Sequence, residues 1–181
     1  MFHSRVEPQP SQYSDSSTVS PVTTPPETEA GNFPDDQDPL RDDGPSLHLV
    51  PWPGSTFIIR SVSCGRVLTL INGQITLTEQ GSRGSFYWVC VEAKGWLGFR
   101  NTVSGKFLGH NDKGMLRCSV DRHQGWENFC FRMRPEGGCV LLMTHWDRLW
   151  HVGFKKEDGK EKLAKIGDGA SDGIVWEFIK V

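Results

Sequence analysis

The segment His145-Trp146-Asp147-Arg148-Leu149-Trp150-His151 holds the densest group of side chains that could recognise a ligand. An aromatic face can stack on a sugar ring, while a carboxylate and an imidazole bind its hydroxyl groups. This chemistry makes His145, Trp146, Asp147, Trp150 and His151 the candidate ligand-binding residues. The alternative, which the sequence alone favours, places Trp150 in the core and His145 in a hairpin, with Asp147 capping the turn.

The most basic stretch follows directly, as a charged segment that we expect to form a loop between Lys155 and Lys162. It could contact an acidic protein surface, although Glu157, Asp158 and Glu161 interrupt it and favour a solvated loop. Nucleic-acid binding is not expected, because the pI of about 6.3 lies well below the value near 9 that is typical of such domains. The candidate protein-contact residues are Lys155, Lys156, Lys160, Lys162 and Lys165.

Two further groups of polar residues, His110-Asn111-Asp112 and Asp121-Arg122-His123, resemble acid/base or metal-binding sets. Both fall in predicted turns, where backbone geometry favours Asn and Asp. The sequence has no Gly-x-Ser-x-Gly elbow, phosphate loop or dinucleotide fingerprint, and no Cys-x-x-Cys pair. We therefore expect no catalytic residue, no metal and no cofactor, and a protein that is not an enzyme.

The first 52 residues differ in composition from the rest of the chain. They contain two basic and nine acidic residues, a net charge of −7, and are rich in Ser, Thr and Pro. Such a segment buries too little apolar surface to offset its ordering entropy, so we predict an acidic, disordered tail over 1–52 and a folded domain over 53–181. The domain carries 18 basic and 13 acidic residues, a net charge of +5.

The compartment is predicted from what the sequence lacks. Residues 1–20 show no apolar segment typical of a secretory signal, and no run approaches the roughly 20 apolar residues of a membrane span. The five cysteines, an odd number, are expected to be reduced thiols. These observations predict a cytoplasmic protein that does not contact a membrane.

Short strand patterns recur through the domain at intervals of about ten residues. Asn72-Gly73 is the strongest hairpin signal, and the stretch from Trp96 to Gly109 reads as strand, turn at Ser104-Gly105, and strand. The order repeats with a period of about forty residues, giving units over about 56–95, 96–138 and 139–181. The closing strands of the second and third units share an aromatic start, Trp126-Glu127 and Trp176-Glu177.

Three four-stranded units predict an all-β fold. Because one such unit cannot enclose a core, the copies must pack on one another. Pseudo-threefold closure gives a β-trefoil, which we predict, while strand spacing alone also suits a β-sandwich.

Three motifs in the domain, Gly95–Asn101, Ser104–Gly109 and Trp126–Phe129, resemble repeats of fascin-type β-trefoils. The resemblance covers residues 55–181, and extends to proteins of filamentous fungi that place one such trefoil behind a disordered N-terminus. It implies membership of the actin-crosslinking-like superfamily and a protein-binding module, with actin as a candidate partner. Fascins carry four trefoils, so one trefoil implies bundling only through a dimer or through the tail. We expect a monomer or a weak dimer.

The alternative function is an intracellular, lectin-like β-trefoil that binds a glycan. Ricin-type trefoils carry Gln-x-Trp in each repeat, and only Gln124-Gly125-Trp126 matches here.

Overall fold

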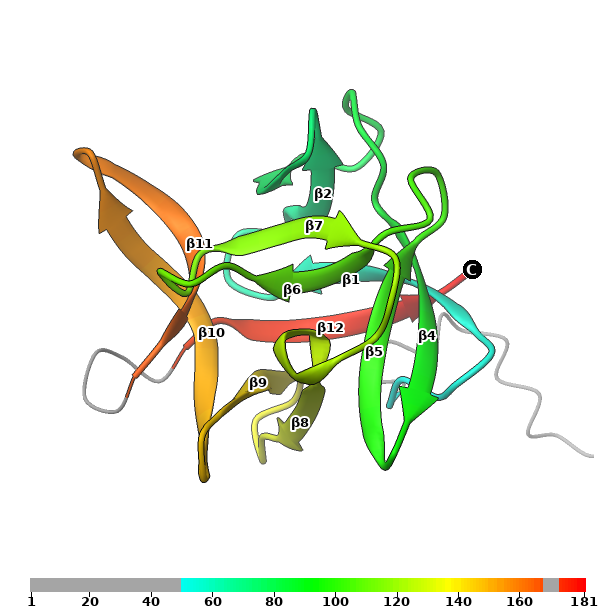
Figure 1. The fold of residues 1–181 in the computed structure, drawn as a ribbon. Helices are drawn as coiled ribbons and strands as arrows, with labels where there is room; N and C mark the ends of the chain where they lie inside the picture. The colour runs from blue at the N-terminus through cyan, green and yellow to red at the C-terminus, as the bar shows by residue number, and fades with distance from the viewer. Residues whose placement is uncertain (1–49, 168–172) are drawn as a thin grey trace, which may run out of the picture. The chain divides into compact units, whose positions relative to one another are not determined.

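A computed structural model describes residues 50–167 and 173–181. The predicted disordered tail lies, over residues 1–49, outside the described residues. In the described part the fold is all-β, with twelve strands and one 3-10 turn, η1 (Figure 1). The elements are β1 Thr56–Ser61, β2 Val67–Ile71, β3 Gln74–Thr78, β4 Tyr87–Ala93, β5 Trp96–Asn101, β6 Phe107–His110, β7 Leu116–Val120, η1 Gly125–Glu127, β8 Phe129–Met133, β9 Cys139–His145, β10 Arg148–Glu157, β11 Lys160–Ile166 and β12 Val175–Lys180.

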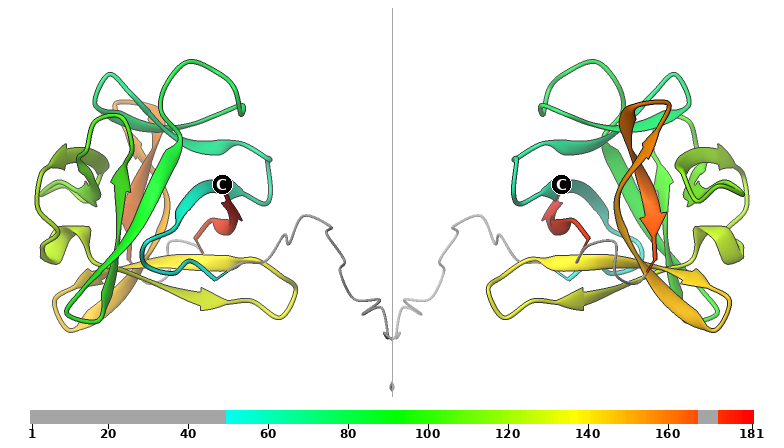
Figure 2. Two further views of the ribbon diagram at one scale, coloured as in Figure 1. Left: turned by 90° about the vertical axis from the view of Figure 1, so that its right-hand side faces the viewer. Right: turned by 90° about the vertical axis from the view of Figure 1, so that its left-hand side faces the viewer.

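Six of these strands pair in a closed ring. The antiparallel pairings run from β1 to β12, β9, β8, β5 and β4, and β4 pairs with β1 again. In both views of Figure 2, β12 (red) lies beside β1 (cyan), where the last strand meets the first. The other six strands form the hairpins β2–β3, β6–β7 and β10–β11. A closed ring leaves no unpaired edge in the strands that form it.

The register shows which residues correspond between the three predicted units. The first and last strands of each unit pair through Phe57↔Trp88, Leu97↔Phe129 and Cys139↔Trp176. Trp88, Phe129 and Trp176 are all fully buried. The expected match of Trp126 with Trp176 is therefore wrong: Phe129 takes the core position, and Trp126 lies in η1 with 49% of its surface exposed.

Aromatic side chains from all three units fill the core inside the ring. Phe178 stacks on Phe99 with ring centroids 5.6 Å apart and meets Phe57 edge to face at 5.8 Å. All five cysteines are free, and Cys90 is fully buried as a small apolar residue. None of the described segments forms a helix with the length and apolarity needed to cross a membrane.

The predicted charged loop at Lys155–Lys162 is wrong. These residues belong to the long hairpin of β10 and β11 (orange in Figure 1), in which Lys155 pairs with Lys162. Only Asp158-Gly159 turns the chain, with both residues at positive φ. The ribbon is exposed on both faces over this stretch, so its charged sequence has no apolar alternation from which a strand could be predicted.

Candidate functional site

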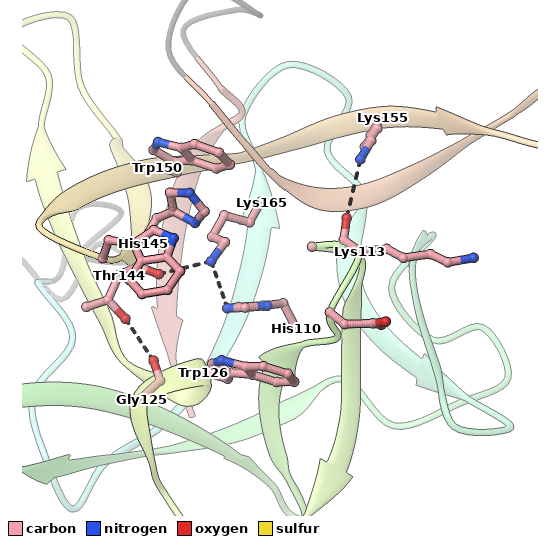
Figure 3. A pocket seen from close by; sticks show the side chains of 12 residues that line it. His110, Lys113, Gly125, Trp126, Thr144, His145, Trp150, Lys155 and Lys165 are labelled. Carbon is pink, nitrogen blue, oxygen red and sulfur yellow. Dashed lines mark hydrogen bonds between the residues drawn. The ribbon is translucent and has the colours of Figure 1, made fainter.

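A pocket of about 430 Å³ opens where η1 and the end of β6 meet the third unit. Its walls come from β6, the turn after it, η1, β9 and the β10–β11 hairpin (Figure 3). Three of the seven tryptophans of the chain line it. The lining residues are His110, Asp112, Lys113, Gly114, Gly125, Trp126, Thr144, His145, Trp146, Trp150, Lys155 and Lys165.

The Lys165 ammonium lies at the centre of this pocket (Figure 3). Lys165 is on β11 and only 7% exposed, unlike the exposed Lys155, Lys156, Lys160 and Lys162. Its Nζ donates to the Thr144 carbonyl oxygen at 3.0 Å and is 2.9 Å from His110 Nε2. Burial lowers the pKa of Lys165, because the charged form loses its hydration.

Both ring nitrogens of His110 lie within hydrogen-bond distance of a partner. Its Nδ1 lies 2.7 Å from the Asn111 carbonyl oxygen, which can only accept, and its Nε2 faces the Lys165 ammonium, which can only donate. The network therefore assigns a neutral imidazole with its proton on Nδ1. Burial, and to a smaller extent the charge of Lys165, lower the pKa of His110.

Two pairs of stacked rings flank the ammonium. His110 stacks on Trp126 with centroids 5.1 Å apart, and His145 stacks on Trp150 at 3.4 Å. Lys165 Nζ lies 5.8 Å from the centroid of Trp150, a cation–π distance. At the rim, Trp146 is 93% exposed at a turn position with φ of 54°. The pocket thus offers aromatic surface beside polar donors.

Close backbone packing holds η1 against β6. A Cβ atom on Gly109 would lie 2.5 Å from Glu127 Oε1 and 3.0 Å from the Trp126 carbonyl oxygen. Glu127 is buried, and its Oε2 accepts from the Gln124 backbone N–H at 3.2 Å. The Thr144 hydroxyl donates to the Gly125 carbonyl oxygen at 2.8 Å, which links η1 to β9. These contacts fix the position of Trp126.

The structure separates the predicted ligand-binding residues. His145, Trp146 and Trp150 line the pocket, whereas Asp147 and His151 do not. His151 follows Trp150 on β10, and neighbouring residues of a strand point to opposite faces; its Nε2 lies 3.4 Å from an Arg132 guanidinium nitrogen.

The candidate protein-contact lysines are also divided. Lys155 and Lys165 line the pocket described above. Lys160 and Lys162 line a second depression of about 700 Å³ between the three hairpins. Lys156 is exposed and lines neither.

Sequence analysis missed His110, Trp126 and Thr144 as site residues. His110 is the last residue of β6, and it is buried because Lys165, 55 positions later, crosses over it. Two local signals point to these residues: the polar group His110-Asn111-Asp112, which the sequence assigns to a turn, and Gln124-Gly125-Trp126, the single Gln-x-Trp match. Within the described residues, no group of three or more His, Cys, Asp or Glu side chains is placed to hold a metal ion.

Comparison with known proteins indicates the fold alone. No protein-family model matches the chain, and neither does any curated protein. Among solved structures it is similar to "GlcNAc[alpha]1-4Gal releasing endo-[beta]-galactosidase from Clostridium perfringens", with a TM-score of 0.55 and 13% identity. The match covers 70% of this chain and 32% of that one, so the chain spans about a third of the enzyme's length.

Proposed function

We propose that the chain is a β-trefoil that acts as a non-catalytic binding module, and that its pocket takes a saccharide. The closed ring of six strands with three hairpins supports the trefoil, since it is the pairing that this fold requires. The single observation that carries the saccharide is the pairing of exposed aromatic surface with buried polar donors in one pocket.

Sugar rings have apolar faces and polar edges, and the pocket matches both. The half-exposed indole of Trp126, braced from behind by His110, offers a flat surface for the face of a ring. The Lys165 ammonium and the imidazole of His145 supply polar groups for the edge. This is the pattern of a small-ligand site, in which a few polar groups orient a ligand that lies on aromatic residues.

A non-catalytic role is supported by the lining residues. Canonical glycoside hydrolysis uses two carboxyl groups on either side of the bond that is broken. Among the described residues that line the pocket, Asp112 supplies one carboxyl group. The similar glycosidase is therefore not a reason to propose hydrolysis here.

A glycan array followed by titration of the best saccharide tests this function. Trp126→Ala should lower the affinity about tenfold, because it removes the stacking surface. Trp52→Ala is the matched control: Trp52 is 37% exposed and lies outside the pocket, against Phe57. No binding on the array, or equal affinities for Trp126→Ala and the unaltered protein, would contradict the proposal.

The fascin-like assignment remains a second proposal, in which the module binds a protein such as actin in the cytoplasm. The observation that favours it is the exposed β10–β11 ribbon, which presents Lys155, Lys156, Lys160 and Lys162 on one hairpin. Co-sedimentation with filamentous actin at low salt tests it, and the quadruple Lys→Gln variant should pellet less. If the unaltered protein stays in the supernatant, actin binding is wrong.

A further inference from the structure

The buried Lys165 ammonium has no carboxylate partner among the described residues. Its two hydrogen-bond partners, His110 Nε2 and the Thr144 carbonyl oxygen, are both uncharged. An ammonium has three N–H donors, so one donor is left over. Burying a cation is costly unless an opposite charge compensates it.

The position of Lys165 is an apolar position in the other two units. In the hairpins β2–β3, β6–β7 and β10–β11, the buried residues Leu68, Leu108 and Val152 pair with Leu77, Cys118 and Lys165 respectively. Cys118 is buried, and Leu77 packs against the core cluster. A lysine therefore replaces an apolar residue at the one copy that lines the pocket, and packing does not explain it.

Most of the charged side chains that line the pocket are positive. Lys113 and Lys155 line the pocket together with Lys165, against the single carboxyl group of Asp112. Lys113 Nζ also lies 3.8 Å from Glu157 Oε1. An ion pair at the surface contributes little to stability. Lys155 Nζ donates to the Lys113 carbonyl oxygen at 3.3 Å, which directs its charge toward the rim. The pocket is thus an electropositive site.

We propose that the saccharide carries an acidic group, a carboxylate or a sulfate, and that this group pairs with Lys165. The inference rests on the proposed saccharide function and adds the charge of the ligand. The Lys165 ammonium lies 2.9 Å from the imidazole nitrogen of His110, and that imidazole stacks on Trp126. A ring on Trp126 can therefore place an acidic substituent against the ammonium. The hydrogen bond between Lys165 and this acidic group would be charge-assisted, and the buried ammonium would then have a counter-charge.

Matched saccharide pairs test this directly. The probes are glucose with glucuronic acid, galactose with galacturonic acid, and galactose with galactose 6-sulfate, so that each pair differs only at C6. Binding to the full-length chain is followed by the ¹H–¹⁵N signals of the tryptophan indoles, three of which line the pocket. The two uronic acid pairs test a carboxylate as the acidic group, and the galactose 6-sulfate pair tests a sulfate.

We expect at least one acidic saccharide to bind about tenfold or more tightly than its neutral partner, as a charge-assisted hydrogen bond predicts. Lys165→Met, which keeps an unbranched side chain of nearly the same length but removes the charge, should abolish this preference. Lys156→Met is the matched control, because Lys156 is exposed on the same hairpin and lines neither pocket; it should keep the preference.

A wild-type experiment covers the case in which Lys165→Met does not fold. Sodium sulfate should compete with the acidic saccharide more strongly than sodium chloride of equal ionic strength, and should leave neutral binding unchanged. Three outcomes would overturn the inference and leave saccharide binding itself in place. They are equal affinity for the neutral and acidic members of every pair, a preference for the acidic saccharide that survives in Lys165→Met, and competition by sulfate that is no stronger than competition by chloride. If neither neutral nor acidic saccharides bind, the proposed function itself is wrong.

Discussion

At the scale of single residues, the site depends on one proton arrangement. His110 must stay neutral to accept from Lys165, because a proton on Nε2 would remove the acceptor and place two cations in contact. Burial of His110 favours this arrangement, since it lowers the pKa of the imidazole and keeps it neutral.

Because His110 must stay neutral, we predict that the folded protein loses stability as the pH falls. Because the pKa of His110 is lower in the folded than in the unfolded chain, the unfolded chain takes up the proton first as the pH falls. The contribution of neutral His110 to the stability of the folded protein is complete above the unfolded pKa of histidine, about 6.5. It is lost progressively as the pH falls from that value through the pKa of His110 in the folded protein. Urea unfolding between about pH 7.5 and 5 should show this loss.

His110→Leu should unfold with a shallower dependence on pH over the same range. Leucine is compatible with the position, because the corresponding residue of the first unit is Leu70, which pairs with Ile75 as His110 pairs with Leu116. An unchanged pH dependence in the variant would show that other groups, His123 or His145, whose pKa values burial also lowers, account for the acid sensitivity.

Two buried tryptophans at corresponding positions should respond differently to the same change. Trp88 Nε1 donates to the Leu68 carbonyl oxygen at 2.9 Å, whereas Trp176 Nε1 is buried without a hydrogen-bond partner among the described residues. Both replacements by phenylalanine remove similar volume, but only Trp88→Phe leaves a buried carbonyl oxygen unsatisfied. Trp88→Phe should therefore cost about 1 kcal/mol more than Trp176→Phe in the free energy of unfolding. Equal urea midpoints would contradict this.

At the scale of elements, the strands could be predicted and their contacts could not. Alternation and turn residues predict three four-stranded units, and the described residues form twelve strands. The predicted loop at Lys155–Lys162 differs from the observed β10–β11 ribbon because the ribbon buries little surface over these residues, and no apolar alternation therefore marks them as strand. His110 and Lys165 meet through hairpins of two different units, and no local pattern contains such a contact.

The contact between η1 and β6 gives a prediction at this scale. Gly109→Ala would place a methyl group against Glu127 and the Trp126 backbone, and η1 would have to move. We expect a loss of about 1–3 kcal/mol in stability, as for other overpacked sites, together with weaker saccharide binding because Trp126 moves with η1.

Gly125→Ala is the matched control for stability, because a Cβ atom there has no atom within 4 Å. Both variants can be compared by urea unfolding followed through tryptophan fluorescence. If Gly109→Ala is as stable as Gly125→Ala, η1 is not held by this close approach.

At the scale of the whole molecule, the ring closes within the described residues. β1 pairs with both β12 and β4, and Pro51 is buried just before it. Removing residues 1–49 should therefore change the free energy of unfolding of the domain by less than about 0.5 kcal/mol, the range typical of changes away from the core. Urea unfolding of the full-length and shortened chains at equal ionic strength measures this, and a larger loss would show that the acidic segment stabilises the domain.

The three units differ in a way that affects how many ligands one protein can bind. The core position that Trp88 and Trp176 fill in the first and third units is filled by Phe129 in the second, where Trp126 lies outside the core. Lys165 likewise has Leu77 and Cys118 as its counterparts. Three similar units thus build one such pocket in the described part of the chain, and one copy of the protein would hold one ligand. Multivalent attachment, with its gain in avidity, would then require several copies brought together.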